Sequence, residues 1–405
     1  MREMEIGIST ERALELIREH VRPVGVEQIS ADAAHGRVLA QDVCAPMDQP
    51  PWPRSPLDGY ALRASDSDGG SASLRVVGTL CAGSWTDETV KPGECFRIMT
   101  GAPIPNGCDC VIRQEDTDQG FPTVQLRKTL KPWENYCFAG DDFHQGDVLL
   151  RSGTRLRGNA LGVLASAGLY HAGETLTVYR AVRCAVLCTG DELVPSGVRP
   201  LPQGKIYSSN EAVIPSRLRE LGCTVTLVQG SFQDDPAALA DAIRKACASA
   251  DVIFTTGGVS VGMKDILHET LPLLDAQRVF WRVRQKPGTP LMFSLLDGVP
   301  ILSLSGNPFA ASATFEMFGR ELLACRAGCG DLRPLRAEAV LETAFPKFGK
   351  GRRFVRGVFC DGRVSLPRGH SSGQLASAVG ANCLAEIPPS DAPLSAGTKV
   401  QVWLL

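Results

Sequence analysis

The stretch Asp251-Val-Ile-Phe-Thr-Thr256, which runs directly into Gly257-Gly-Val-Ser-Val-Gly262, decides the fold of this 405-residue chain. A short apolar, β-branched run that ends in glycine is typical of a buried strand that opens into a loop. Similar runs alternate with helical patterns from Val182 to about Leu323. Such alternation predicts βαβ units and a mostly parallel sheet, and therefore an α/β domain over residues 181–330.

The expected elements of this domain follow from apolar runs and helix-start signals. The predicted strands are Val182–Cys188, Cys223–Val228, Asp251–Thr256, Val279–Arg284, Leu291–Ser294 and Ile301–Leu304. The predicted helices are Glu211–Leu221 with Asn210 as N-cap, Pro236–Ala248, Ile266–Leu274 and Phe309–Leu323.

The regions on either side of the α/β domain have different sequence patterns. Thr10–His20 reads as an amphipathic helix with Thr10 as its N-cap, and Arg157–Ala167 also looks helical, so we assign residues 1–45 and 147–180 to a helical and linker region. Residues 46–146 contain short β-like runs punctuated by proline and glycine, which predicts a small β module. Residues 331–405 return to short strands.

Composition narrows the class of protein. The chain has 42 basic and 44 acidic side chains and a net charge of −2, so it lacks the electrostatic footprint of a nucleic-acid-binding protein. No apolar run approaches the roughly 18 residues of a membrane span, and the N-terminus carries acids where a signal peptide is apolar. We therefore expect a cytoplasmic protein, in which the 14 scattered cysteines are reduced and mostly structural.

The residues that follow the predicted strands should form one site. In an open parallel sheet, ligands bind beyond the carboxyl ends of the strands. There the sequence places carboxylates able to hold Mg²⁺, a lysine, and glycine-rich loops that an anion can approach. These segments are Thr189-Gly-Asp-Glu192, Asp234-Asp235, Thr255–Gly262 with Asp265, Lys286-Pro-Gly-Thr-Pro290 and Ser305-Gly-Asn-Pro308.

Each of these residues also has a purely structural interpretation. Glycine after a strand often only makes a turn, Asp234 and Asp265 could each be a helix N-cap, and Lys286 could be a solvated surface side chain. The functional interpretation rests on several such loops falling on one edge of one sheet. Neither a P-loop nor a dinucleotide-binding Gly-x-Gly-x-x-Gly motif is present, which disfavours the common nucleotide folds.

The β module adds two turns with polar side chains, Ser55-Pro-Leu-Asp-Gly-Tyr-Ala61 and Ile98-Met-Thr-Gly-Ala-Pro-Ile-Pro105. Turn chemistry alone explains both. With these turns included, however, the chain closely resembles the molybdopterin molybdenumtransferases, the molybdenum insertases that include the C-terminal domain of gephyrin. The matching motifs occur in the same order as in the family and cover nearly the whole chain. They are Ser55–Ala61, Met99–Pro105, Gly140-Asp-Asp142, Cys188–Leu193, Ile206–Asn210, Thr256–Gly262, Lys286-Pro-Gly288 and Gly306-Asn-Pro308.

The resemblance implies an α/β multidomain homodimer with a C-terminal β-barrel and a β module inserted into the helical and linker region. It implies that the site lies between the α/β domain of one subunit and the β module of its partner, so that Asp58 and Thr100 complete it in trans. The implied reaction inserts molybdate into adenylated molybdopterin, with Mg²⁺, and releases AMP and molybdenum cofactor. A molybdopterin adenylyltransferase is a further partner that the resemblance suggests.

The resemblance also assigns roles to residues. The implied catalytic residues are Glu192, Asp265, Asp58, Lys286 and Thr100. The implied Mg²⁺ ligands are Glu192, Asp265 and Asp142. The implied binding residues for molybdopterin, phosphate or oxyanion are Gly257, Gly258, Ser260, Asp234, Ser305, Asn307, Pro308, Arg352 (with Arg353 as the alternative) and Ser372.

Some positions depart from the family pattern. Thr289 stands where the family usually has a second lysine, Ser305 where it has proline, and Cys137-Phe-Ala139 where it tends to have arginines. These departures concern the oxyanion more than the fold. They leave open a paralogue that binds molybdopterin or a protein without turnover, and, ranked last, a molybdopterin adenylyltransferase.

Overall fold

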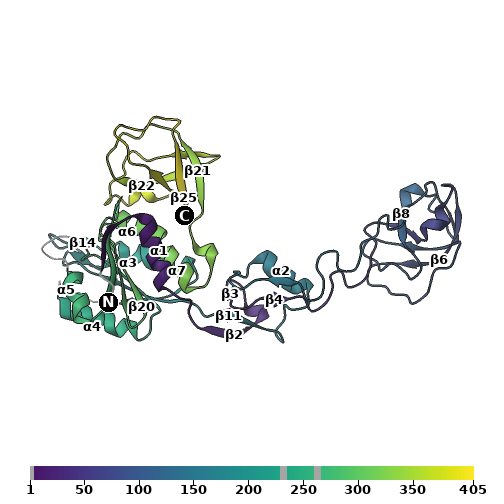
Figure 1. Cartoon of the computed structure of the whole chain (residues 1–405), viewed down its shortest axis with the longest axis horizontal. Helices are drawn as coiled ribbons and strands as arrows, with labels where there is room; N and C mark the ends of the chain where they lie inside the picture. Colours follow the sequence, from purple (N-terminus) through teal and green to yellow (C-terminus); the bar gives the residue numbers. More distant parts are fainter. Residues whose placement is uncertain (1–3, 229–234, 260–265) are drawn as a thin grey trace.

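The computed structural model describes residues 4–228, 235–259 and 266–405. The molecule is elongated: the α/β domain and the C-terminal β domain lie at one end, the β module lies at the other, and a linker region joins them (Figure 1). No helix within the described ranges is long and apolar enough to cross a membrane.

The α/β domain is built on a seven-stranded sheet in the order β1-β17-β19-β20-β16-β12-β15. The strands β20, β16, β12 and β15 pair in parallel, β1 pairs in parallel with β17, and β19 is antiparallel to both of its neighbours. The mostly parallel sheet expected from the sequence is therefore confirmed. The bounds are β1 Glu5–Ile8, β12 Arg183–Cys188, β15 Thr224–Val228, β16 Val252–Thr256, β17 Gln277–Val283, β19 Met292–Leu296 and β20 Val299–Leu304.

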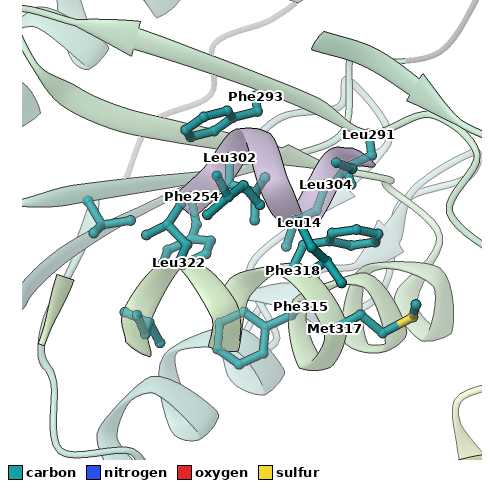
Figure 2. Packing of buried hydrophobic residues seen from close by; sticks show 14 of the residues in the cluster. Leu14, Phe254, Leu291, Phe293, Leu302, Leu304, Phe315, Met317, Phe318 and Leu322 are labelled. Atoms are coloured by element: carbon teal, nitrogen blue, oxygen red, sulfur yellow. The ribbon is translucent and has the colours of Figure 1, made fainter. Parts of the chain in front are cut away.

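Helices cover both faces of this sheet. One face packs against α1 (Thr10–His20), α3 (Asn210–Glu220), α6 (Pro308–Thr314) and α7 (Arg320–Arg326), and the other packs against α4 (Pro236–Cys247) and α5 (Ile266–Leu273). The predicted closing helix runs as α6, a π-helical turn over Phe315–Gly319, and α7. Figure 2 shows the core on the first face, where the Phe254 and Phe315 ring centroids lie 5.4 Å apart.

The N-terminal segment joins the α/β domain, which the sequence did not predict. Glu5 pairs with Phe280 and Ile8 with Val283, so β1 becomes the edge strand of the main sheet. Helix α1 packs beside it, and Leu14 enters the same core as Phe254 (Figure 2). The predicted α/β span of residues 181–330 thus leaves out two elements that pack with it.

Two predicted helix caps were wrong. The N-cap of α1 is Ser9, whose hydroxyl accepts a hydrogen bond from the Arg12 backbone N–H, whereas Thr10 donates to the buried Gln285 side chain at 3.0 Å. The N-cap of α3 is Ser209, and Asn210 is the first helical residue. Both side chains are used for longer-range contacts, which a local capping signal does not reveal.

The predicted β module contains a five-stranded sheet in the order β8-β5-β7-β6-β9. Its strands are β5 Gly59–Leu62, β6 Ser73–Leu80, β7 Glu94–Ile98, β8 Cys110–Arg113 and β9 Thr123–Gln125. The linker region contains α2 (Gly158–Ser166) and also small sheets that were not expected. Their strands are β2 Val26–Ser30, β3 Val38–Leu39, β4 Val43–Cys44, β10 Val148–Leu150 and β11 Thr175–Tyr179.

The C-terminal domain is a small barrel, as the resemblance implied. Five strands close on themselves through the pairing of β22 with β24. They are β21 Arg336–Leu341, β22 Arg352–Cys360, β23 Arg363–Ser365, β24 Cys383–Ile387 and β25 Lys399–Leu404. A sixth, two-residue strand, β18 (Gln285–Lys286), comes from the α/β domain and pairs in parallel with β22.

A buried ion cluster holds the linker region to the α/β domain. The Asp251 carboxylate is 4% exposed and accepts hydrogen bonds from Arg180 at 2.6 Å and from the Arg183 backbone N–H at 2.9 Å. Burial alone would raise the pKa of Asp251, but the hydrogen bonds from Arg180 and Arg183 outweigh it and hold the pKa well below its usual range. The carboxylate is therefore charged in the folded protein.

We expect Asp251→Asn to lower the free energy of unfolding at pH 7 by about 1–3 kcal/mol, because it removes the buried carboxylate that accepts hydrogen bonds from the partly exposed guanidinium groups of Arg180 and Arg183. A carboxylate whose pKa is lowered by folding stabilises the protein above its unfolded pKa of about 4, and this contribution is lost as the pH falls towards the folded pKa. Urea denaturation should therefore show the difference from the wild type narrowing below about pH 4.

The matched control is Asp241→Asn, because the Asp241 side chain is 68% exposed and pairs with Arg244 at the surface. Its effect should stay within about 1 kcal/mol. Equal losses for the two variants at pH 7 would contradict the anchoring role of Asp251.

Candidate active site

A cavity of about 660 Å³ lies where the carboxyl ends of the parallel strands meet the C-terminal barrel. The loops after β12, β16, β17 and β20 form its α/β wall, and residues of the barrel form the opposite wall. Strand β17 is parallel to β20 because β19 is antiparallel to both, so all four loops emerge at one edge. The loop convergence expected from the sequence is present in the fold.

Two positive residues are brought together by the pairing of β18 with β22. Lys286 is in register with Arg353, and both line the cavity, together with Lys347 of the barrel. Within the part of the chain that the structure describes, none of the three forms an ion pair. The cavity wall therefore favours an anionic ligand.

Of the two candidate arginines of the barrel, Arg353, the alternative match, is the one that reaches the cavity. Arg353 lines it, whereas the Arg352 side chain forms ion pairs with Glu11 and, at 3.2 Å, with Glu386. Arg352 thus connects the barrel to α1. The arrangement favours Arg353 as the oxyanion-binding arginine.

Glu192 is the one carboxylate in the described part of the cavity wall. It lies beside Gly190, where an added Cβ would come within 2.7 Å of a Glu192 carboxylate oxygen. The predicted residues Asp234, Ser260 and Asp265 lie outside the described residues. Asp235, which follows Asp234, is the N-cap of α4 and accepts a hydrogen bond from the Ala237 backbone N–H at 2.9 Å. Ile266, which follows Asp265, is the first residue of α5.

The glycine loop after β16 packs against the loop after β12. Gly257 has a φ of +92°, and a Cβ there would lie 2.3 Å from the Thr189 carbonyl oxygen. Gly258 has a φ of +62° and approaches Ile266 in the same way. These two glycines are therefore required by the backbone geometry, and both also line the cavity.

The third wall loop contains Ser305, Asn307 and Pro308, all of which line the cavity. Ser305 is buried, and its hydroxyl accepts a hydrogen bond from the Asn307 backbone N–H at 3.3 Å, which holds the turn. The Phe309 backbone N–H donates to the carbonyl of Ser372 at 3.1 Å. Ser372, predicted from a loosely matching segment, therefore lies in the cavity wall against this loop.

Three polar residues of the wall lie in segments quoted from the sequence but were given no binding role there. Asn210 is 5% exposed, and its side-chain amide donates to the Gly306 carbonyl at 3.0 Å. Its Oδ1 and the hydroxyls of Ser208 and Thr256 are buried without a hydrogen-bond partner within the described ranges. Ligand groups or water in the cavity would satisfy them. The Ile206–Asn210 motif was the available signal.

Thr289 lies in the cavity wall at the position where the family usually has lysine. Its hydroxyl donates to the Gln285 carbonyl at 2.5 Å, so it supports the strand that contains Lys286 rather than supplying charge. Lys347 and Arg353 supply positive charge on the opposite wall.

The β module contains the other predicted residues. The Asp58 Oδ1 accepts hydrogen bonds from the Thr100 backbone N–H and from the Thr100 hydroxyl, each at 2.7 Å. These bonds, the backbone one first, lower the pKa of Asp58. Asp142, also within residues 46–146, is exposed. None of these residues lines the cavity of its own chain.

The donor set at the cavity fits one mode of Mg²⁺ binding. In the described ranges, no cluster of three or more carboxylate, histidine or cysteine side chains could hold a metal ion by itself. Mg²⁺ commonly keeps several waters and is held by one or two carboxylates together with substrate phosphates. Glu192 can serve as such a carboxylate when a phosphate-containing ligand is present.

We expect Gly257→Ala to destabilise the protein more than Gly298→Ala. Both glycines have a positive φ, which costs an alanine about 1–2 kcal/mol, but only Gly257 has an atom in the path of the new Cβ, since nothing lies within 4 Å at Gly298. The clash at Gly257 should add about 1–3 kcal/mol and shift the cavity loop.

Urea denaturation measures the first effect, and calorimetric titration with pyrophosphate measures the second. Gly257→Ala should weaken pyrophosphate binding, and Gly298→Ala should leave it unchanged. Equal behaviour of the two variants would contradict the role of this close loop contact.

Family models match three consecutive parts of the chain. Residues 8–168 match the MoeA N-terminal region (domain I and II), and residues 185–324 match a probable molybdopterin binding domain. Residues 338–405 match the MoeA C-terminal region (domain IV). The three matches follow the order of the linker with its β module, the α/β domain and the barrel.

Similar proteins cover almost the whole chain. The molybdopterin molybdenumtransferase of Staphylococcus epidermidis is 32% identical over 411 residues, which cover 99% of this chain and 96% of the relative. That of Staphylococcus aureus is 33% identical over 384 residues, with 93% and 90% covered. The crystal structure of a molybdopterin biosynthesis moeA protein from Pyrococcus horikoshii OT3 superposes with a TM-score of 0.85 at 25% identity, covering 98% of this chain and 100% of that one.

Proposed function

The chain belongs to the molybdopterin molybdenumtransferase family, transferases of molybdenum cofactor biosynthesis, and from this premise we propose that it inserts molybdate into adenylated molybdopterin with release of AMP. The observation that supports this most directly is the cavity at the sheet edge, where Lys286, Lys347 and Arg353 face a space of about 660 Å³. A cavity of this size suits a nucleotide-sized ligand, and its positive charge suits phosphates and an oxyanion.

The proposed reaction combines the formation of Mo–S bonds with the hydrolysis of the phosphoanhydride. Two Mo–S bonds form as two oxygens of molybdate leave as water, which takes up the two thiol protons and two protons from solution. One water cleaves the phosphoanhydride, so that AMP leaves and the molybdopterin keeps its own phosphate. Both substrates are anionic, and a cluster of cations can hold them close together despite their mutual repulsion.

The chain's own residues divide these tasks. Arg353 can form two parallel hydrogen bonds to an oxyanion or phosphate, whereas Lys286 acts as a more compact charge at the end of the strand that pairs with it. The glycines Gly257 and Gly258 let the backbone approach the ligand closely. The unsatisfied Asn210 Oδ1 can accept an N–H of the ligand and orient it.

We propose Mg²⁺ as the cofactor, with Glu192 as a ligand and Asp265, Asp234 and Asp142 as further candidates. When bound, Mg²⁺ would neutralise charge on the phosphoanhydride. We also propose a cytoplasmic location, which suits the free state of the cysteines. A molybdopterin adenylyltransferase is the enzyme class that would supply the adenylated substrate.

We propose that the functional unit is a homodimer in which Asp58 and Thr100 act in trans. In one chain the β module lies at the opposite end of the molecule from the cavity (Figure 1). The Asp58–Thr100 pair is a preorganised polar group on an exposed turn, and a second copy would bring it to the cavity. This arrangement would give the Asp58–Thr100 pair a function beyond joining two turns of its own module.

The first test is AMP release from adenylated molybdopterin, with Mg²⁺, at graded molybdate and tungstate. We expect oxyanion-dependent release, and we expect Glu192→Gln to lower the rate by at least tenfold, as loss of one transition-state charge contact does. Glu174→Gln, at a half-buried carboxylate of the linker region that does not line the cavity, is the control and should leave the rate unchanged. Tight binding of the substrate without AMP release by the wild type would instead support a non-catalytic paralogue.

The second test mixes two inactive variants, Asp58→Asn and Lys286→Ala. A mixed dimer has one site with both changes and one site with neither, if Asp58 acts in trans. After dissociation and reassociation, the mixture should recover about a quarter of the wild-type activity, because half of the dimers are mixed and each has one intact site. Activity that never exceeds that of the separate variants would contradict completion in trans.

A further inference from the structure

Two tryptophans on the β module are exposed together. The Trp52 side chain is 45% exposed and the Trp85 side chain is 63% exposed. Their ring centroids lie 5.7 Å apart with planes inclined at 70°, and the Trp85 Nε1–H donates to Asp87 at 3.0 Å. Because removing the apolar surface of an indole from water is favourable, a pair of exposed indoles in contact is a candidate surface for a ligand.

The pair lies beside the Asp58–Thr100 turn. The Pro53 carbonyl accepts from the Ile104 backbone N–H at 2.9 Å, and the Ser55 carbonyl accepts from Gly101 at 2.8 Å, so the segment that begins at Trp52 runs along the Thr100 turn. On the other side, the turn that leads to Trp85 approaches Gly101, where an added Cβ would lie 3.7 Å from that of Ala82. The segments that carry the two indoles thus adjoin the turn whose Thr100 binds the Asp58 carboxylate.

The chemistry of this end suits a flat, amine-bearing heterocycle. Two rings inclined at 70° form a corner in which a planar ligand can stack on one indole and touch the other with its edge. A purely apolar partner would desolvate the Asp58 carboxylate without compensation, which is costly. A fused heterocycle with amino groups offers both a π-face and N–H donors, and each end of adenylated molybdopterin has one.

We propose that Trp52 and Trp85 form a stacking site for a heterocycle of the substrate, which the β module of one subunit presents to the cavity of its partner. This inference rests on the proposed function. It adds an aromatic binding surface to the polar groups that the module was expected to supply. Pterin and adenine share the required chemistry, so the experiment must distinguish them.

The test compares Trp52→Leu and Trp85→Leu with a control variant, Phe121→Leu. Phe121 is 69% exposed and precedes β9, whose Thr123 pairs with Arg75. Arg75 is also in register with Glu94, at the end of β7 opposite to Ile98 and the Thr100 turn. The control therefore removes an aromatic ring that is more exposed than either tryptophan from the far end of the same sheet.

Calorimetric titrations with AMP and, separately, with neopterin show which heterocycle binds. When an aromatic ring on which a base stacks is removed, the affinity for that base typically falls by about tenfold. We expect each tryptophan variant to weaken one of the two ligands by about tenfold and to raise the KM for adenylated molybdopterin similarly, with molybdate half-saturation unchanged. Trp85→Phe should restore most of the affinity.

Unchanged titrations and unchanged KM in both tryptophan variants would overturn the proposal, as would an equal loss in Phe121→Leu. Loss of the dimer in size-exclusion chromatography with unchanged affinity per remaining dimer would also overturn it, and would make the pair a subunit contact. If the wild type releases no AMP, the proposed function fails, whereas the titrations still decide whether the stacking site exists.

Discussion

The two-residue pairing of β18 with β22 is the constraint on which the site depends. It places Gln285 and Lys286 of the α/β domain in register with Arg352 and Arg353 of the barrel. The buried Arg320 reinforces the junction, since its guanidinium donates to backbone carbonyls of Leu332, Arg333 and Leu404. Without this junction the cavity would have an α/β wall and no opposite wall, and Lys286 would be an isolated surface lysine.

The electrostatics of the site follow from that junction. A parallel sheet alone would gather glycine loops and Glu192 at its edge, which gives shape but little positive charge. The barrel contributes Arg353 and Lys347, and the cavity becomes cationic although the whole chain has a net charge of −2. The local field that a ligand meets is therefore set by which domains adjoin, and the composition of the chain does not reveal it.

The strands that the sequence predicted correctly include those that are buried along almost their whole length. Strands β12, β16 and β20 are buried over nearly their whole length, and the ends of these runs located Thr189, Gly257 and Ser305 at one edge. It missed β1, because Glu5–Ile8 is short and contains glycine, and its partner β17 comes much later in the chain. It also could not fix whether Arg352 or Arg353 faces the cavity, since adjacent residues of a strand point to opposite faces and a one-residue shift exchanges them.

The place of β1 has a consequence for the order in which the molecule can form. The ribosome makes this strand and helix α1 well before their partner, since β1 pairs with β17 (residues 277–283), some 270 residues later in the chain. At a synthesis rate of about 5–20 residues per second, roughly 15–55 s pass between the synthesis of β1 and that of its partner strand β17. During that interval the apolar stripe of α1, with Leu14 and Ile17, has no core to enter. Until β17 is made, this stretch of the growing chain is open to chaperones and proteases.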